Sequence, residues 1–175
     1  LLNMGLFLTP QCLSRIMYMD MLYKQIVDVQ GVVMEFGCRW GQNLSLFSAM
    51  RGIYEPFNRL RKIVGFDTWS GFPDVEKEDT TAWKSGDFAV PENYENYLDE
   101  IISIHEQMAP IPSVRKHSLV KGDATKTIKE YLANHPEEWE NTNIDIWDRY
   151  IPNEYLDELV YYNINDTMST LALFI

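Results

Sequence analysis

Cysteine and positive charge are both scarce in this sequence. Cys12 and Cys38 are the only cysteines among 175 residues, too few for a disulfide framework or a cysteine-based metal cluster. We therefore expect a protein of a reduced, cytoplasmic setting. The 15 basic residues are outnumbered by 26 acidic ones, which gives a formal net charge of −11. Such a surface repels nucleic acids and anionic membranes, so neither is expected as a partner.

Long apolar runs are missing as well. Residues 1–8 are apolar but have no basic n-region, so they are not interpreted as a signal peptide. No stretch approaches the roughly 20 apolar residues of a membrane span. The overall composition, 46% apolar and 13% aromatic, is nevertheless typical of a globular protein with a real core. We expect a single domain over residues 1–175, with a helical cap over 1–30 and the core over 31–175.

Residues 32–43, with the sequence VVMEFGCRWGQN, organise the rest of the chain. A short β-branched run, typical of a buried parallel strand, breaks into a loop that holds Gly37 and Gly41. Glycine lets backbone N–H groups approach a ligand closely, and strand, glycine loop and helix in this order open a nucleotide-binding α/β unit. Asn43 is predicted to be the N-cap of the helix that follows.

A second apolar strand, residues 62–66, ends on Asp67. In doubly wound sheets an acid at this position can accept hydrogen bonds from both ribose hydroxyls of an adenosine ligand. Asp67 is therefore the best single candidate for a ligand contact. Trp69 and Phe72 follow in a turn-rich loop at the same edge of the sheet. Either ring could stack on an adenine, and either could simply pack into the core.

A third strand, residues 116–120, precedes Asp123 and a helix over residues 125–134. An acid just beyond a strand could accept a hydrogen bond from an adenine amino group. It could equally cap the helix that it precedes. Both interpretations stay open, although the presence of two further acids, Glu35 and Asp67, at the other strand ends favours the contact with the ligand.

The other elements carry weaker signals. The charged stretch 51–61 is interpreted as a solvated connection rather than as a wall for an acidic substrate. The polar insertion 75–91 is expected to frame the substrate pocket.

Together the patterns predict a Rossmann-like, doubly wound, mostly parallel α/β sheet with an N-terminal helix packed over the sheet edge. The remaining helices and strands are expected at residues 10–29 (with Thr9 as N-cap), 92–108, 143–147 and 169–175.

The segments VVMEFGCRWGQN, IVGFDTWSGFP and LVKGDATKTI, in this order, resemble class I S-adenosylmethionine-dependent methyltransferases. Residues 31–132 resemble more closely the macrocin-type sugar O-methyltransferases. The resemblance implies S-adenosylmethionine as cofactor and methyl transfer to a hydroxyl of a sugar or another small substrate. It also implies the cofactor-binding residues, which are Glu35, Gly37, Cys38, Gly41, Asp67, Thr68, Trp69, Asp123 and Ala124.

Two alternatives to this enzyme stay open. The first is an NAD-dependent oxidoreductase, which is disfavoured because the spacing from Gly37 to Gly41 is not the G-x-G-x-x-G that a dinucleotide pyrophosphate needs. The second is a methyltransferase-like binding module without catalysis. A homo-oligomer is compatible with the sequence in every case.

A sugar hydroxyl is a poor nucleophile, so a base or a metal must help to remove its proton. The macrocin-type resemblance implies acidic segments late in the fold that bind a divalent metal, and carboxylates suit Mg²⁺. The late acidic motif is truncated here, and we hypothesise that the core is incomplete around residues 140–165. The three histidines are interpreted as structural or solvated. The candidates are Asp145 and Asp157 for catalysis, and Asp145, Asp157 and Glu158 for the metal.

Overall fold

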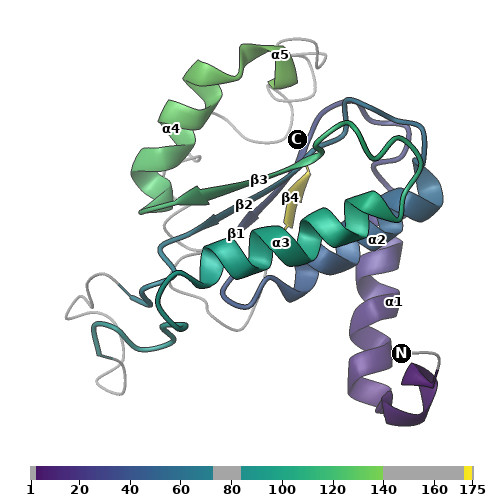
Figure 1. Cartoon of the computed structure of the whole chain (residues 1–175), viewed down its shortest axis with the longest axis horizontal. Coiled ribbons are helices and arrows are strands. Elements are labelled where there is room, and N and C mark those ends of the chain that lie inside the picture. Colours follow the sequence, from purple (N-terminus) through teal and green to yellow (C-terminus); the bar gives the residue numbers. More distant parts are fainter. Residues whose placement is uncertain (1–2, 73–83, 140–171, 175) are drawn as a thin grey trace.

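A four-stranded sheet lies at the centre of the fold, in a computed structural model that describes residues 3–72, 84–139 and 172–174. Strands β1 (Val33–Phe36), β2 (Ile63–Asp67) and β3 (His117–Lys121) run parallel to one another. Strand β4 (Ala172–Phe174) pairs antiparallel with β1, and the order across the sheet is β3-β2-β1-β4. The carboxyl ends of the three parallel strands therefore meet at one edge (Figure 1).

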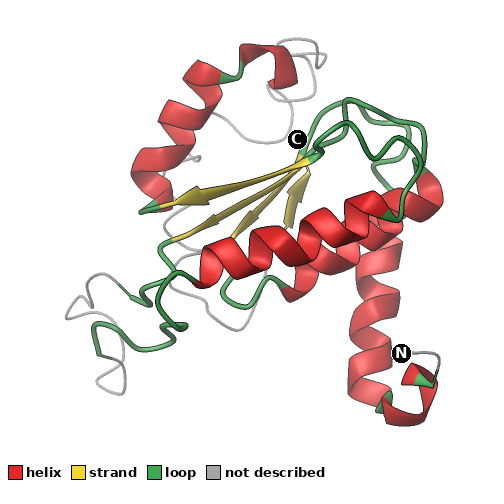
Figure 2. Cartoon of the chain, viewed as in Figure 1, coloured by secondary structure: helices red, strands yellow, loops and turns green. Residues whose placement is uncertain are grey.

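Helices cover both faces of the sheet, as Figure 2 shows. Helices α2 (Gln42–Tyr54) and α3 (Tyr94–Gln107) lie on one face, while α4 (Ala124–Asn134) and the short α5 (Pro136–Trp139) lie on the other (Figure 1). The predicted Rossmann-like, mostly parallel α/β fold is thus confirmed. Because both faces are covered, every residue of β1 is buried, Glu35 included, and the other three residues of the strand are apolar, as expected of a strand buried on both faces.

Alternate residues of the strands divide the core into two clusters. Val33 and Ile63 pack in a cluster with residues of α2 and α3, while Met34 and Phe66 pack with α4 on the opposite face. This is the two-residue period of a pleated strand, with apolar side chains required on both sides. The position of each strand residue in the sequence therefore decides which helices it contacts.

The N-terminal segment forms the short 3-10 helix η1 (Met4–Phe7) and then α1 (Pro10–Lys24), which packs against α2. Thr9 is the N-cap, and its side chain accepts a hydrogen bond from the backbone N–H of Cys12. This start is as predicted, since proline suits the first helical position. The predicted end at residue 29 is wrong, because α1 stops at Lys24 and turns follow. No helix among the described residues is long and apolar enough to cross a bilayer.

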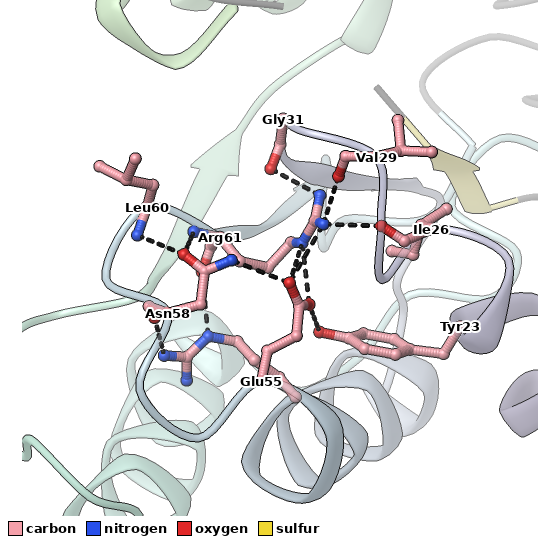
Figure 3. A network of polar contacts seen from close by, with 9 residues as sticks. Tyr23, Ile26, Val29, Gly31, Glu55, Asn58, Leu60 and Arg61 are labelled. Carbon is pink, nitrogen blue, oxygen red and sulfur yellow. Dashed lines mark hydrogen bonds and ion pairs between the residues drawn. The ribbon is translucent and has the colours of Figure 1, made fainter.

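Arg61 holds the turns that follow α1 (Figure 3). Its guanidinium donates hydrogen bonds to the carbonyl oxygens of Ile26, Val29 and Gly31, which lie beyond the end of the helix. The same group forms an ion pair with Glu55 (Nε to Oε2, 3.0 Å), whose Oε2 also accepts a hydrogen bond from the Tyr23 hydroxyl at 2.6 Å. The chain between α1 and β1 is thus held by one buried cation.

This network corrects the interpretation of residues 51–61 as a solvated connection. Arg51 and Arg61 are each only 2% exposed. Arg51 donates to the carbonyl oxygens of Arg61 and Asn58, at 3.0 and 3.1 Å. A charge run usually faces water, but here two guanidiniums find enough acceptors to be buried. Their charge therefore stabilises the fold and forms no wall for a substrate.

The later predictions are tested only in part. The helix expected over 92–108 is α3, and the strand expected over 116–120 is β3, each with bounds shifted by one or two residues. The last strand is present as Ala172–Phe174. The strand expected at 143–147, the hypothesised gap around 140–165 and most of the insertion 75–91 lie outside the described residues.

Candidate functional site

The loop that follows β1 begins and ends on glycine, and the two glycines differ. Gly37 is exposed with a φ of +76°, and no atom lies within 4 Å of the place where a Cβ would stand. Gly41 has a φ of +68°, but a Cβ there would lie 2.3 Å from Cδ1 of Leu98. Gly37 thus leaves backbone open to a ligand, while Gly41 allows α3 to pack closely against the loop.

Helix α2 starts two residues earlier than predicted. Gly41, in the left-handed conformation, is its N-cap, and the predicted N-cap Asn43 lies inside the helix. The side chain of Asn43 is turned inward, where its Nδ2 donates a hydrogen bond to Oε1 of Glu35 at 3.0 Å. The amide is therefore engaged by a buried carboxyl group instead of by the helix backbone.

Asp67 lies at the carboxyl end of β2 and is tied to the glycine loop. Its Oδ2 accepts a hydrogen bond from the backbone N–H of Arg39 at 2.7 Å, and its Oδ1 accepts one from the backbone N–H of Trp69 at 2.6 Å. The backbone N–H of Gly37 bonds to the carbonyl oxygen of Phe66 at 2.9 Å. The acid and the glycine loop, which the sequence placed on two separate strands, are thus brought together at one edge.

Glu35 is a buried acid beside this loop, only 1% exposed. Burial raises its pKa to about 8, against the opposing effects of the hydrogen bond from Asn43 and the positive charge of Arg15. Among the described residues, Oε2 of Glu35 has no hydrogen-bond partner although it is buried. A buried oxygen without a partner is costly unless a ligand satisfies it.

In the loop after β2, fewer side chains are available to contact a ligand than the sequence predicts. Trp69 is 5% exposed and belongs to the core cluster on the α2 face, and its Nε1 donates to the carbonyl oxygen of Arg39 at 3.2 Å. The core-packing interpretation therefore fits Trp69 better than adenine stacking. Thr68 donates its hydroxyl to the carbonyl oxygen of Gly71 at 2.7 Å. Phe72 packs edge-on against Phe88, with ring centroids 5.4 Å apart.

Asp123 caps α4, which is one of its two predicted roles. Its Oδ1 accepts hydrogen bonds from the backbone N–H and the hydroxyl of Thr125, at 3.0 and 2.7 Å. These bonds, with Lys126 nearby, lower its pKa. Asp123 follows Lys121, which is in register with Asp67, so the two acids share the same edge of the sheet. Ala124 is buried against the α4 face of the core and can offer only its backbone.

Cys38 also has only its backbone to offer. The thiol is buried, and Sγ lies 3.3 Å from the carbonyl oxygen of Glu35 and 3.5 Å from that of Phe66. Burial raises the pKa of this thiol well above its ordinary value. It is therefore a neutral core group and no nucleophile.

Exposed aromatic rings lie next to the glycine loop. Trp40 is 48% exposed and Tyr97 is 59% exposed. Tyr94 lies beside both: its ring centroid is 5.0 Å from that of Trp40 and 5.8 Å from that of Tyr97, and its hydroxyl donates to the carbonyl oxygen of Trp40. The Arg39 guanidinium lies 5.8 Å from the Trp40 ring. The surface formed by Arg39, Trp40, Tyr94 and Tyr97 is called the aromatic rim below.

The predicted catalytic and metal-binding acids Asp145, Asp157 and Glu158 lie outside the described residues. Within the part of the chain that is described, no group of three His, Cys, Asp or Glu side chains could hold a metal ion. His117 begins β3 and contacts Asp99 and Glu106, so it lies at the edge opposite to Asp67. Its contacts fit the structural interpretation.

Two residues near Glu35 were not predicted as part of the site. The sequence predicts Asn43 as a helix cap, and Arg15 lies within the helix that it predicts over residues 10–29. Arg15 reaches Asn43 across 28 residues of sequence, and no local pattern reveals such a pairing. A polar residue in the first turn of a helix after a glycine loop was the only available signal.

No protein-family model and no curated protein matches the chain. Solved structures do match, among them two of the enzyme CalS11. A crystal structure of CalS11, a calicheamicin methyltransferase, has a TM-score of 0.73 and 45% sequence identity, over 78% of this chain and 54% of CalS11. An apo structure of CalS11, there described as a TDP-rhamnose 3'-O-methyltransferase of calicheamicin biosynthesis, has a TM-score of 0.65 and 40% identity, over 78% and 51% of the two chains.

This chain thus spans about half the length of CalS11. At 45% identity the likeness concerns sequence as well as fold. The resemblance predicted from the three motifs is therefore confirmed, and over most of its length the chain is similar to a sugar O-methyltransferase.

Proposed function

We propose that this chain forms the cofactor-binding part of an S-adenosylmethionine-dependent sugar O-methyltransferase. The observation that carries the proposal is the hydrogen bond from the Arg39 backbone to Asp67, at the carboxyl edge of the sheet, in a chain that is 45% identical to CalS11 over 78% of its length. An acid in this position suits the paired hydroxyls of an adenosine ribose.

The described residues fit this cofactor. Gly37 leaves open backbone, Asp67 provides an acceptor at the strand end, and Glu35 holds a buried oxygen without a partner. When bound, S-adenosylmethionine supplies an electrophilic methyl group. The contribution of the chain is to hold the cofactor and to keep the acceptor hydroxyl in line with it, and correct placement alone can lower a barrier substantially.

The aromatic rim supports a sugar as the acceptor. Exposed Trp and Tyr rings present flat apolar faces with a polar end, which suits a ligand that is polar at its hydroxyls and apolar at its C–H groups. CalS11 is described as acting on TDP-rhamnose. We extend this to a nucleotide-linked or glycan-linked sugar for the present chain, and the cation of Arg39 suits the phosphates of the former.

Removal of the hydroxyl proton stays assigned to Asp145 and Asp157, with Glu158 as a further Mg²⁺ ligand. The motif resemblance alone supports this assignment. It predicts that Asp145→Ala or Asp157→Ala abolishes turnover while cofactor binding is retained, and that EDTA has the same effect as either substitution. Unchanged turnover in both variants would remove the metal from the proposal.

Since both described cysteines are free thiols, we place the reaction in the cytoplasm.

Titration calorimetry tests the function directly. We expect S-adenosylmethionine and S-adenosylhomocysteine to bind and NAD not to bind; the reverse would favour the oxidoreductase. Turnover is then measured with a panel of nucleotide sugars and glycans. Binding of the cofactor without turnover on any acceptor would indicate the non-catalytic binding module instead.

A further inference from the structure

Helix α1 reaches the candidate cofactor site through a single side chain. Arg15 donates two hydrogen bonds to Oδ1 of Asn43, from Nη2 at 2.9 Å and from Nε at 3.3 Å. Asn43 in turn donates from Nδ2 to Oε1 of Glu35 at 3.0 Å. Asn43 is 2% exposed and Glu35 is 1% exposed. We call this chain of hydrogen bonds, from the half-buried Arg15 to the buried Asn43 and Glu35, the relay.

The relay has a fixed direction. A guanidinium can only donate hydrogen bonds, so it requires the amide oxygen of Asn43 on its side. The amide nitrogen must then point to Glu35 and donate. An ionised carboxyl group accepts such a bond well, because it is acceptor-only. The relay thus favours the carboxylate form of a group that burial alone would keep protonated.

Burial is the largest effect on the ionisation of Glu35 and raises its pKa. The Asn43 amide, the Arg15 cation and the backbone N–H of Leu44 lower this pKa, while the negative charge of Asp67 raises it. The neighbouring thiol of Cys38 stays neutral, because its own pKa is raised well above the ordinary value. From α1, the positive charge of Arg15 therefore opposes the rise in the pKa of Glu35 that burial causes.

We propose that Arg15 and Asn43 are positioning residues of the cofactor site, which orient Glu35 and favour its carboxylate form, with the buried Oε2 available to accept an N–H or O–H of the cofactor. Helix α1 then belongs to the cofactor site although its backbone lies outside it. This inference rests on the proposed function, since it needs a cofactor that binds next to Glu35.

The test is the pH dependence of S-adenosylhomocysteine binding, measured by calorimetry from about pH 6 to about pH 9. In the unaltered protein, affinity should rise with pH around the pKa of Glu35, which is about 8. Arg15→Met removes a charge that lowers this pKa, so the midpoint should move to higher pH. Affinity below the midpoint should fall about tenfold for each unit of that shift.

Two more variants and a control complete the design. Asn43→Asp puts a second carboxylate where Glu35 needs a donor and should shift the midpoint upward as well. Arg15→Lys keeps the charge and should lie between Arg15→Met and the unaltered protein. Lys24→Met removes an exposed cation from the same helix, and should leave the profile unchanged. Circular dichroism and ¹³C NMR titration of Glu35 in the ligand-free variants separate misfolding from a change in ionisation.

The outcomes are distinct. If Arg15→Met and Asn43→Asp fold but keep the midpoint of the unaltered protein, or if Lys24→Met shifts it equally, the relay is only structural and the inference is overturned. If the unaltered protein binds no S-adenosylhomocysteine at any pH, the proposed function fails, and this inference fails with it. Should Arg15→Met not fold, Arg15→Lys and Asn43→Asp decide the question.

Discussion

The backbone N–H of Arg39 donates a hydrogen bond to Oδ2 of Asp67 over 2.7 Å, across 28 residues of sequence. This bond joins the loop after β1 to the end of β2, so that each segment restrains the other. The same carboxylate accepts the backbone N–H of Trp69. Asp67 is therefore both the predicted ligand contact and the residue that holds the surrounding loops in place.

Asp67→Asn should weaken cofactor binding. The amide replaces one acceptor oxygen by a donor, which must then face the N–H of Arg39 or of Trp69. We expect the Kd for S-adenosylhomocysteine to rise at least about tenfold, or about 1.4 kcal/mol, as measured by calorimetry. Asp28→Asn is the control, because Asp28 is an exposed acid in the turns that follow α1. This variant should bind S-adenosylhomocysteine with an unchanged Kd. Equal affinity of both variants would remove Asp67 from the site.

Substitution of the two loop glycines should separate stability from binding. Gly41→Ala places a Cβ against Leu98 in a left-handed conformation, so it should lower the free energy of unfolding by about 2–4 kcal/mol. Gly37→Ala meets no neighbour, and should cost only the backbone strain of about 1 kcal/mol. Urea unfolding measures both values.

Cofactor binding gives the second readout for this pair. Gly37→Ala adds a methyl group where the ligand approaches, so it should reduce affinity more than its small effect on stability would suggest. Full affinity in Gly37→Ala would mean that the open backbone there is not part of the cofactor site.

Arg61→Met should be among the most destabilising substitutions in the chain. It leaves Glu55 buried without its cation and leaves three carbonyl oxygens without their donor. Removal of one partner from a buried pair costs about 3–5 kcal/mol. The measurement is urea unfolding followed by circular dichroism. Arg59→Met, at an exposed position of the same stretch, should change the free energy of unfolding by less than about 0.5 kcal/mol; a similar loss in both variants would contradict the network.

Trp40→Ala should affect the acceptor and not the cofactor. The ring is 48% exposed on the aromatic rim, so its loss should raise the KM for the sugar about fivefold or more. The Kd for S-adenosylhomocysteine should stay the same. Tyr18→Ala removes an exposed ring from α1 instead and should leave KM unchanged. If Trp40→Ala also leaves KM unchanged, the aromatic rim does not bind the acceptor.

Local patterns predicted the parts of the site that lie on single elements. The β-branched run before Gly37, the carboxylate of Asp67 after the next strand, and the Thr9–Pro10 start of α1 are all in the predicted places. Each depends on interactions within a few residues, such as a pleat, a turn or a cap. The sheet edge that Gly37 and Asp67 share then follows from parallel pairing of consecutive strands.

Local patterns could not predict which polar side chains are buried. Arg61 reads as part of a solvated charge run, but it finds acceptors that lie up to 35 residues away in the sequence. The sequence left open whether Trp69 stacks on a ligand or packs into the core, and it packs into the core. Burial of such groups depends on partners from distant elements, and these partners have no periodic signature.

The sequence by itself therefore determined the positions of β1, β2 and β3 along the chain, the glycine loop and the acid at the end of β2, because these follow from backbone conformation and from short-range apolar periodicity. Only the tertiary structure decided where α1 ends, that Asn43 faces Glu35, and that Arg15 donates to Asn43 from another helix. Those features depend on hydrogen-bond partners that are far apart in the chain and meet only when the helices pack against the sheet.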